Sequence, residues 1–124
     1  MKPPTSSGSG NWPASQKTRT ISSAFYAVEQ GSRYVRRFKV YLRDGTVMSI
    51  PYATLPLMTY DPAGMITIKA SELTIIIHGR GLGKLTDWFS EEKILWIKES
   101  PSGIDPEREE VFLSKIEVQE ADDP

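Results

Sequence analysis

The glycine-rich segment 79–86, which reads Gly-Arg-Gly-Leu-Gly-Lys-Leu-Thr, comes nearest in this sequence to a phosphate-binding motif. A P-loop needs one glycine, four further residues and then Gly-Lys followed by Ser or Thr. In this chain His78 takes the place of the first glycine, and Leu85 replaces the hydroxyl that would hold magnesium. The dinucleotide-binding pattern also fails, because the third glycine comes one residue early. We therefore expect the glycines to let the chain turn from a strand into a helix.

Few other residues are suited to catalysis or metal binding. The chain has no cysteine and one histidine, His78, which excludes thiolate zinc sites, cysteine nucleophiles and centres with several histidines. A single histidine at the end of an apolar strand is typical of a boundary residue bonded to its neighbours. The acidic pairs at 91–92 and 109–110 are adjacent in sequence, so their carboxylates point in different directions. Residues 105–110 lack the glycine turn of a calcium loop. We expect no catalytic residue, no metal and no cofactor, and hence no enzyme.

The charges are distributed unevenly along the chain. Residues 1–43 contain eight Lys or Arg and one acidic residue, whereas residues 44–124 contain seven basic and fifteen acidic residues. The net charge of −1 therefore conceals a basic first part and an acidic second part. Such an asymmetry makes the basic part the first place to look for a binding surface.

The candidate binding site is a basic strand face within residues 33–43. Alternation of polar and apolar residues predicts a half-buried strand there. Its polar face carries four cations and one aromatic side chain: Arg33, Arg37, Lys39, Tyr41 and Arg43. Cations beside an aromatic ring can follow a phosphate backbone and stack a base. The alternative, which we favour from sequence because the domain as a whole has no basic excess, is that these charges pair with acidic strands near Glu99 and Glu117.

The pattern around this strand predicts mainly β structure. Asp44-Gly45 is typical of a type I′ turn, in which both central residues have positive φ, and it predicts a hairpin. In strand 93–99 we place Ile94 and Trp96 on one face, opposite Leu95 and Ile97. The predicted strands are residues 33–43, 46–52, 65–69, 73–78, 93–99 and 111–118.

Helices are expected to be few and short. Leu82, Leu85 and Phe89 recur at helical spacing and predict an amphipathic helix over 81–90. Residues 22–30 begin with serine and end before Gly31, as a capped helix would, but they also alternate like a strand; we favour the helix. Residues 53–58 contain Pro56 and are expected to form a turn or a single helical turn.

These elements predict a mainly β or α+β fold, namely a small antiparallel barrel or sandwich of about six strands with one or two short helices. A length of 124 residues fits one domain. We place that domain at residues 21–119. Residues 1–20 are rich in Pro, Ser and Gly and are expected to be disordered, and residues 120–124 form an acidic tail expected to be frayed.

Three stretches of the chain resemble a family of small bacterial domains: residues 40–45, 49–52 and 75–82. The resemblance spans about residues 38–100 and implies no particular activity. The chain is also superficially similar to Sm-like RNA-binding barrels, through Asp44-Gly45 after a strand and a glycine-containing turn late in the sheet. The predicted helix 81–90, followed by two more strands, departs from that fold, so no RNA-contacting residue is carried over.

The predicted function is a non-enzymatic interaction module that binds a protein partner or a second copy of itself. The alternative is single-stranded nucleic-acid binding through the basic strand face. No apolar run approaches the roughly 20 residues that a membrane span needs. The first four residues lead into Ser and Gly instead of the apolar stretch of a signal peptide. We therefore expect a cytoplasmic protein with no membrane partner.

Overall fold

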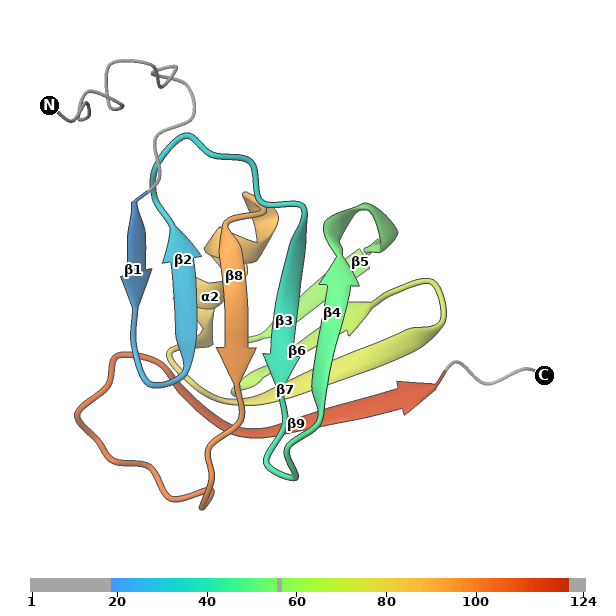
Figure 1. Ribbon diagram of the computed structural model, residues 1–124. Helices are drawn as coiled ribbons and strands as arrows, with labels where there is room; N and C mark the ends of the chain where they lie inside the picture. The colour runs from blue at the N-terminus through green and yellow to red at the C-terminus, as the bar shows by residue number, and fades with distance from the viewer. Residues whose placement is uncertain (1–18, 56, 121–124) are drawn as a thin grey trace, which may run out of the picture.

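Nine strands in the described part of the chain form two sheets (Figure 1). The computed structural model describes residues 19–55 and 57–120. The five-stranded sheet has the order β1 (Thr20–Ser22), β2 (Tyr26–Glu29), β8 (Ile94–Lys98), β3 (Arg37–Tyr41), β4 (Val47–Pro51). The four-stranded sheet has the order β5 (Leu57–Asp61), β6 (Met65–Lys69), β7 (Leu73–Arg80), β9 (Phe112–Glu120). The described helices are α2 (Leu82–Ser90) and the single 3-10 turn η3 (Tyr52–Thr54).

The mainly β class is confirmed, and of the two predicted architectures the closed barrel is wrong. All six predicted strands are present, but β1, β2 and β5 bring the number among the described residues to nine. Most of the predicted tail 1–20 lies outside the described residues, as does 121–124 of the acidic tail. No helix among the described residues is long and apolar enough to cross a membrane.

The predicted helix at 22–30 is wrong, because tertiary pairing overrides its helix-like ends. Strand β2 is held between β1 and β8, and all four of its residues are buried. The serine that looks like a helix cap instead closes the β1–β2 turn, where the Ser23 hydroxyl accepts the backbone N–H of Phe25 at 3.0 Å. The N–H of Gly31 bonds to the Glu29 carboxylate at 3.0 Å and so ends the strand.

The hairpin of β3 and β4 is present, with a shorter first strand and a different turn from the one predicted. Its loop has three residues, 43–45, and only Gly45 has a positive φ, of 96°. The N–H of Gly45 donates to the carbonyl of Leu42 at 3.0 Å, as in a type I turn followed by a left-handed residue. The Asp44 carboxylate accepts the N–H of Thr46 at 2.9 Å, which favours this turn over type I′.

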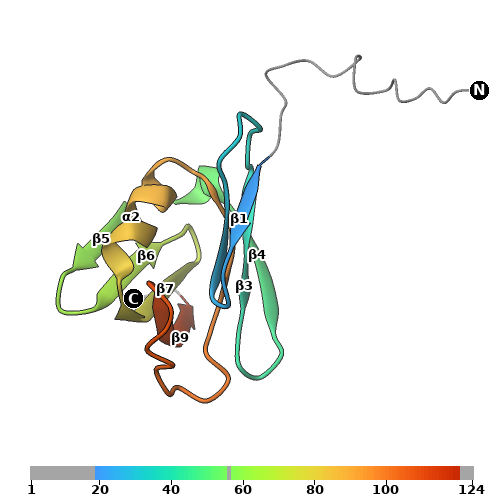
Figure 2. The same ribbon diagram turned by 90° about the vertical axis from the view of Figure 1, so that its left-hand side faces the viewer.

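The core lies between the two sheets, whose strands run in different directions in Figure 1 and whose layers are separate in Figure 2. The inward residues of both sheets form one apolar cluster, which includes Phe38, Val40, Ile66 and Ile77. Helix α2 lies on the same side of the five-stranded sheet as the four-stranded sheet, and the ring of its Phe89 meets Phe38 edge-on at 5.2 Å. The buried stripe of Leu82, Leu85 and Phe89 is confirmed.

A parallel pair at the centre of the five-stranded sheet departs from the all-antiparallel expectation. Strand β8 runs parallel to β3, with Lys39 opposite Trp96 and Tyr41 opposite Lys98. Strand β8 reaches this place only after the chain has formed the β5–β7 strands and α2, so no local turn predicts the pairing. The pairing places an aromatic residue and a lysine of β8 beside the basic strand.

The glycines of segment 79–86 allow two backbones to approach closely. A Cβ at Gly79 would lie 1.8 Å from the carbonyl oxygen of Phe112, and one at Gly81 would lie 2.1 Å from that of Glu110. Gly81 also has a φ of 73° at the start of α2, which supports the predicted role in the strand-to-helix turn. These positions therefore need glycine, because the backbone at residues 110–112, where β9 begins, leaves no room for a Cβ.

Gly79→Ala is expected to lower the free energy of unfolding by about 3 kcal/mol, because the added methyl overlaps backbone that cannot move freely. Gly45→Ala is the matched control, since no atom lies within 4 Å of its added Cβ. The control should lose only about 1 kcal/mol, from its positive φ. Urea denaturation measures both, and equal losses would contradict the close approach to β9.

Candidate functional site

The structure separates the five predicted binding residues into two groups. Arg37, Lys39 and Tyr41 lie on β3 with their side chains on the outward face of the five-stranded sheet, opposite to the buried Phe38 and Val40. Arg33 and Arg43 lie outside the strand, because β3 begins at residue 37 and ends at residue 41. The structure therefore keeps Arg37, Lys39 and Tyr41 together on one strand face and places Arg33 and Arg43 beyond the two ends of that strand.

Arg33 forms an ion pair with a buried acid of its own neighbourhood. Its guanidinium lies 3.3 Å from the carboxylate of Glu29, four residues earlier. The other oxygen of Glu29 accepts the backbone N–H groups of Arg19 and Gly31 at 2.7 and 3.0 Å. Because Glu29 is fully buried, Arg33 compensates a charge that would otherwise be isolated. Arg33 thus supports the fold at this end of the sheet.

Arg43 belongs to a junction between the two sheets. Glu99, only 8% exposed, accepts the backbone N–H of Arg43 at 2.6 Å and that of Ile116, in β9, at 3.1 Å. The guanidinium of Arg43 lies 3.7 Å from the same carboxylate. It also donates to the carbonyls of Ser100 and Ser114, both at 2.8 Å. The predicted pairing of the basic strand with Glu99 is therefore correct for Arg43.

The remaining basic residues on the outward face have no carboxylate partner among the described residues. Arg37 donates to the side chain and carbonyl of Ser49 at 2.9 and 3.4 Å. Lys39 has no ion pair within the part of the chain that the structure describes. Glu117, the other acid expected to pair with this strand, lies in the four-stranded sheet and bonds to His78. Within residues 19–55 and 57–120, the predicted pairing with Glu99 and Glu117 is therefore not seen for these two cations.

Strand β8 adds Trp96 and Lys98 to this face, and both were missed from sequence. Trp96 meets Tyr41 edge-on with ring centroids 5.9 Å apart, and both rings are half-buried. Together with Lys98 they line an open hollow of about 270 Å³. We call the five residues of this surface the outer basic face: Arg37, Lys39, Tyr41, Trp96 and Lys98.

A β-bulge explains why Trp96 faces outward. Ala27 is in register with Trp96 and Val28 with Ile94, so Leu95 is an extra residue on β8. The extra residue lets Ile94 and Ile97 both enter the core, although strict alternation would put them on opposite faces. The predicted grouping of Ile94 with Trp96 is wrong for this reason. The one signal in the sequence was that residues 93–99 contain a tryptophan and lysines, which are side chains that can bind nucleic acid.

The outer basic face is uncovered by any described element. In Figure 2 the four-stranded sheet and α2 both lie on the opposite side of the five-stranded sheet. Glu29 is the one acidic residue within the five strands of this sheet as the structure describes them. Its carboxylate is buried and is bonded to Arg19, Gly31 and Arg33. The face is therefore positive in a chain whose net charge is −1.

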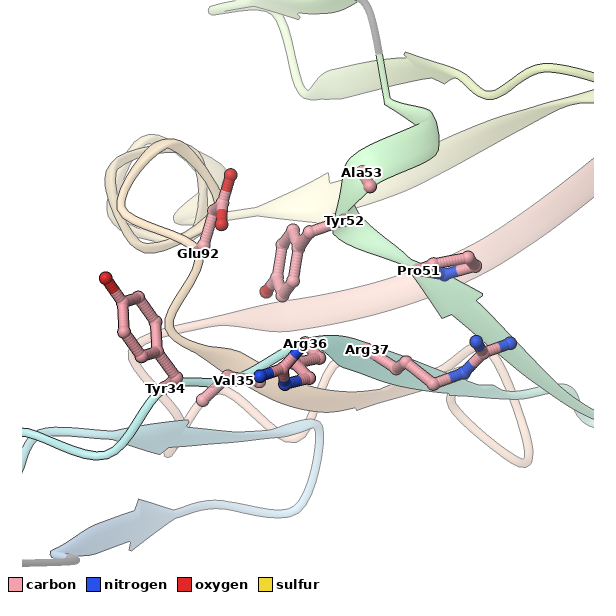
Figure 3. Close-up of a pocket in the computed structure, with 8 residues that line it drawn as sticks. All are labelled: Tyr34, Val35, Arg36, Arg37, Pro51, Tyr52, Ala53 and Glu92. Atoms are coloured by element: carbon pink, nitrogen blue, oxygen red, sulfur yellow. The ribbon is translucent and has the colours of Figure 1, made fainter. Parts of the chain in front are cut away.

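A second concave feature lies at the start of β3 (Figure 3). It is an open depression of about 590 Å³, lined by Tyr34, Arg36, Arg37, Tyr52 and Glu92 among others. Tyr52 is a fixed wall, since its hydroxyl donates to the carbonyl of Ile94 at 2.7 Å and burial raises its pKa. Arg37 belongs to both features, so the depression continues the outer basic face at one end.

The other chemical candidates are held in structural interactions. The His78 ring lies 2.6 Å from the Glu117 carboxylate, while the Ser114 hydroxyl bonds to the backbone carbonyl of His78 and not to its ring. Arg80 binds Asp105 through two nitrogens at 2.6 and 2.8 Å and holds the pKa of that carboxyl at about 2. Within residues 19–55 and 57–120, no group of three His, Asp or Glu side chains lies together as metal ligands would.

No protein-family model matches this chain, and neither a curated protein nor a solved structure matches it significantly. The resemblance to small bacterial domains therefore stays a prediction.

Glu99→Ala is expected to lower the free energy of unfolding by about 3 kcal/mol, because it leaves two backbone N–H groups and a nearby guanidinium without their acceptor. Glu99→Gln should lose less, since it keeps one acceptor oxygen. Glu91→Ala, at an exposed acid, is the control and should change stability by less than about 0.5 kcal/mol. The same chemical denaturation midpoint for all three variants would contradict the claim that the Glu99 carboxylate stabilises the junction of the two sheets.

Proposed function

We propose that this protein is a non-enzymatic binding module that holds single-stranded nucleic acid on its outer basic face. The observation that carries the proposal is the Tyr41–Trp96 pair with Lys39 and Lys98 beside it, on an uncovered sheet surface. Aromatic rings on a sheet can stack bases of any sequence, and neighbouring cations neutralise phosphates. Without a reactive group on this face, the expected result is binding and not turnover.

The dimensions of the face suit a short stretch of an extended strand. Arg37, Lys39 and Tyr41 occupy alternate positions of β3, so the first and last are about 13 Å apart along the strand. Trp96 and Lys98 lie about 5 Å to the side, on the neighbouring strand β8. A polynucleotide running along β3 would therefore meet cations and rings in turn.

The acidic excess of the chain does not oppose this proposal, because several of the acids are buried, ion-paired or located on the other sheet. Glu99 is buried at the sheet junction, and Glu117 lies on the other sheet. Asp105 and Glu110 bind Arg80 and Lys84. This separation of charge supports attraction of a polyanion to one face of a protein that is nearly neutral overall. We also propose a cytoplasmic location, where the protein would meet single-stranded nucleic acid.

A protein partner, or a second copy of the chain, is the second candidate for the same face. Val47 lies opposite Tyr41 on β4 and is 52% exposed, so the face has an apolar margin. An acidic protein segment would use the same lysines and would add contact with Val47. The two candidates differ in what the aromatic pair binds: bases in one case and apolar side chains in the other.

A labelled dT12 oligonucleotide is expected to bind the outer basic face with a salt-dependent affinity. Neutralisation of about three phosphates predicts a slope of about −2 for log K against log salt, and Lys39→Gln should reduce it to about −1.4. Trp96→Ala should weaken binding roughly tenfold through loss of stacking. Fluorescence anisotropy at several salt concentrations measures all three quantities.

Lys69→Gln is the matched control, since Lys69 is an exposed lysine on the outward side of the other sheet. It should leave both the affinity and the slope unchanged. Absence of salt-dependent dT12 binding would reject the nucleic-acid proposal. A loss of self-association in Lys39→Gln, measured by light scattering, would then favour the second candidate.

A further inference from the structure

The depression at the start of β3 contains opposite charges that do not neutralise each other. Arg36 and Glu92 both line it, yet they form no ion pair, and no other ion pair involving either is present in the described chain. In Figure 3, Tyr34 and Tyr52 stand on two sides of a gap, with Glu92 above it and Arg36 below it. Tyr34 is 88% exposed, an unusual position for an aromatic ring with no apolar contact to bury it.

Glu92 holds its place at a conformational cost. It follows the end of α2 with a φ of 58°, in the left-handed region where glycine or asparagine is usual after a helix. Its N–H donates to the carbonyl of Phe89 at 3.0 Å, and the N–H of Lys93 donates to that of Trp88 at 2.9 Å. The backbone therefore fixes the position of this residue, while its carboxylate has no ion-pair partner among the residues that the structure describes.

A ligand that complements this depression offers hydrogen-bond donors to Glu92, a flat ring to Tyr34 and an anionic group to Arg36. A nucleotide has this pattern when its base donates. Guanine presents N1–H and the N2 amino group side by side, so it can give two parallel hydrogen bonds to one carboxylate. Adenine and cytosine offer a single amino group with an acceptor beside it, and thymine places carbonyl oxygens on both sides of its N3–H.

We propose that the depression binds a guanine nucleotide at one end of the strand held on the outer basic face. In this arrangement Glu92 accepts from the Watson–Crick edge of the base, Tyr34 stacks on it and Arg36 binds its phosphate. Arg37, which lines the depression and lies on the outer basic face, continues the phosphate path between the two. The inference rests on the proposed function and adds base preference to it.

The test compares dT12 with oligonucleotides of the same length that carry one guanine, hypoxanthine or adenine at the 5′ or the 3′ end. At one of the two ends, guanine should improve the affinity about tenfold over dT12, as expected for a bidentate contact. Hypoxanthine lacks the N2 amino group and should give a smaller gain, and adenine should give none. Equal affinities for all of them would overturn the guanine site while the proposed function stands. Absence of binding by any oligonucleotide would overturn both.

Glu92→Gly separates recognition from folding. Glycine suits the left-handed conformation, so the variant should be at least as stable as the parent in thermal denaturation. It should still bind dT12 but lose the tenfold preference for terminal guanine. Glu91→Gln, at the preceding acid that does not line the depression, should keep the preference. A preference that survives Glu92→Gly would overturn the assignment of the carboxylate.

Discussion

The carboxylate of Glu99 joins the two sheets through hydrogen bonds to both of them. It accepts backbone N–H groups from the β3–β4 turn and from β9, and it lies beside the Arg43 guanidinium. A buried charge of this kind is costly unless it is paired and hydrogen-bonded, so it favours one arrangement of the ends of β3, β8 and β9. That arrangement sets the parallel pairing of β3 with β8, and the pairing in turn brings Trp96 beside Lys39.

The basic residues of the first part of the chain therefore have two different roles. Arg33 and Arg43 compensate the buried acids Glu29 and Glu99 and belong to the fold. Arg37 and Lys39 alternate with core residues on β3, so the same burial that fixes Phe38 and Val40 directs them to solvent. A sheet whose inner face is the core and whose outer face has cations around an aromatic pair supports the binding proposal without requiring a basic protein.

Local sequence patterns predicted much of the fold, because the β3–β4 hairpin, helix α2 and the glycine turn depend on neighbours in the chain. Strand β2 was predicted as a helix because its burial comes from pairing with β8, far along the sequence. Strand β1 is exposed and pairs with β2 at the edge of the sheet, so no buried apolar pattern marks it. For the site, sequence identified Lys39 and Tyr41 but not Trp96, whose outward direction depends on the extra residue Leu95 in the bulge. The depression was missed because Glu92 and Arg36 come from separate elements that only the tertiary structure brings together.

The most direct test of the account is a map of where single-stranded nucleic acid contacts the protein. Titration of the ¹⁵N-labelled protein with dT12, followed by two-dimensional NMR, reports each backbone amide and the indole of Trp96. If the strand binds on the outer basic face, the largest shifts cluster at Lys39, Tyr41, Trp96 and Lys98, and the strands of the other sheet are unchanged. Shifts centred on the four-stranded sheet, or spread evenly over the surface, would contradict binding at the outer basic face.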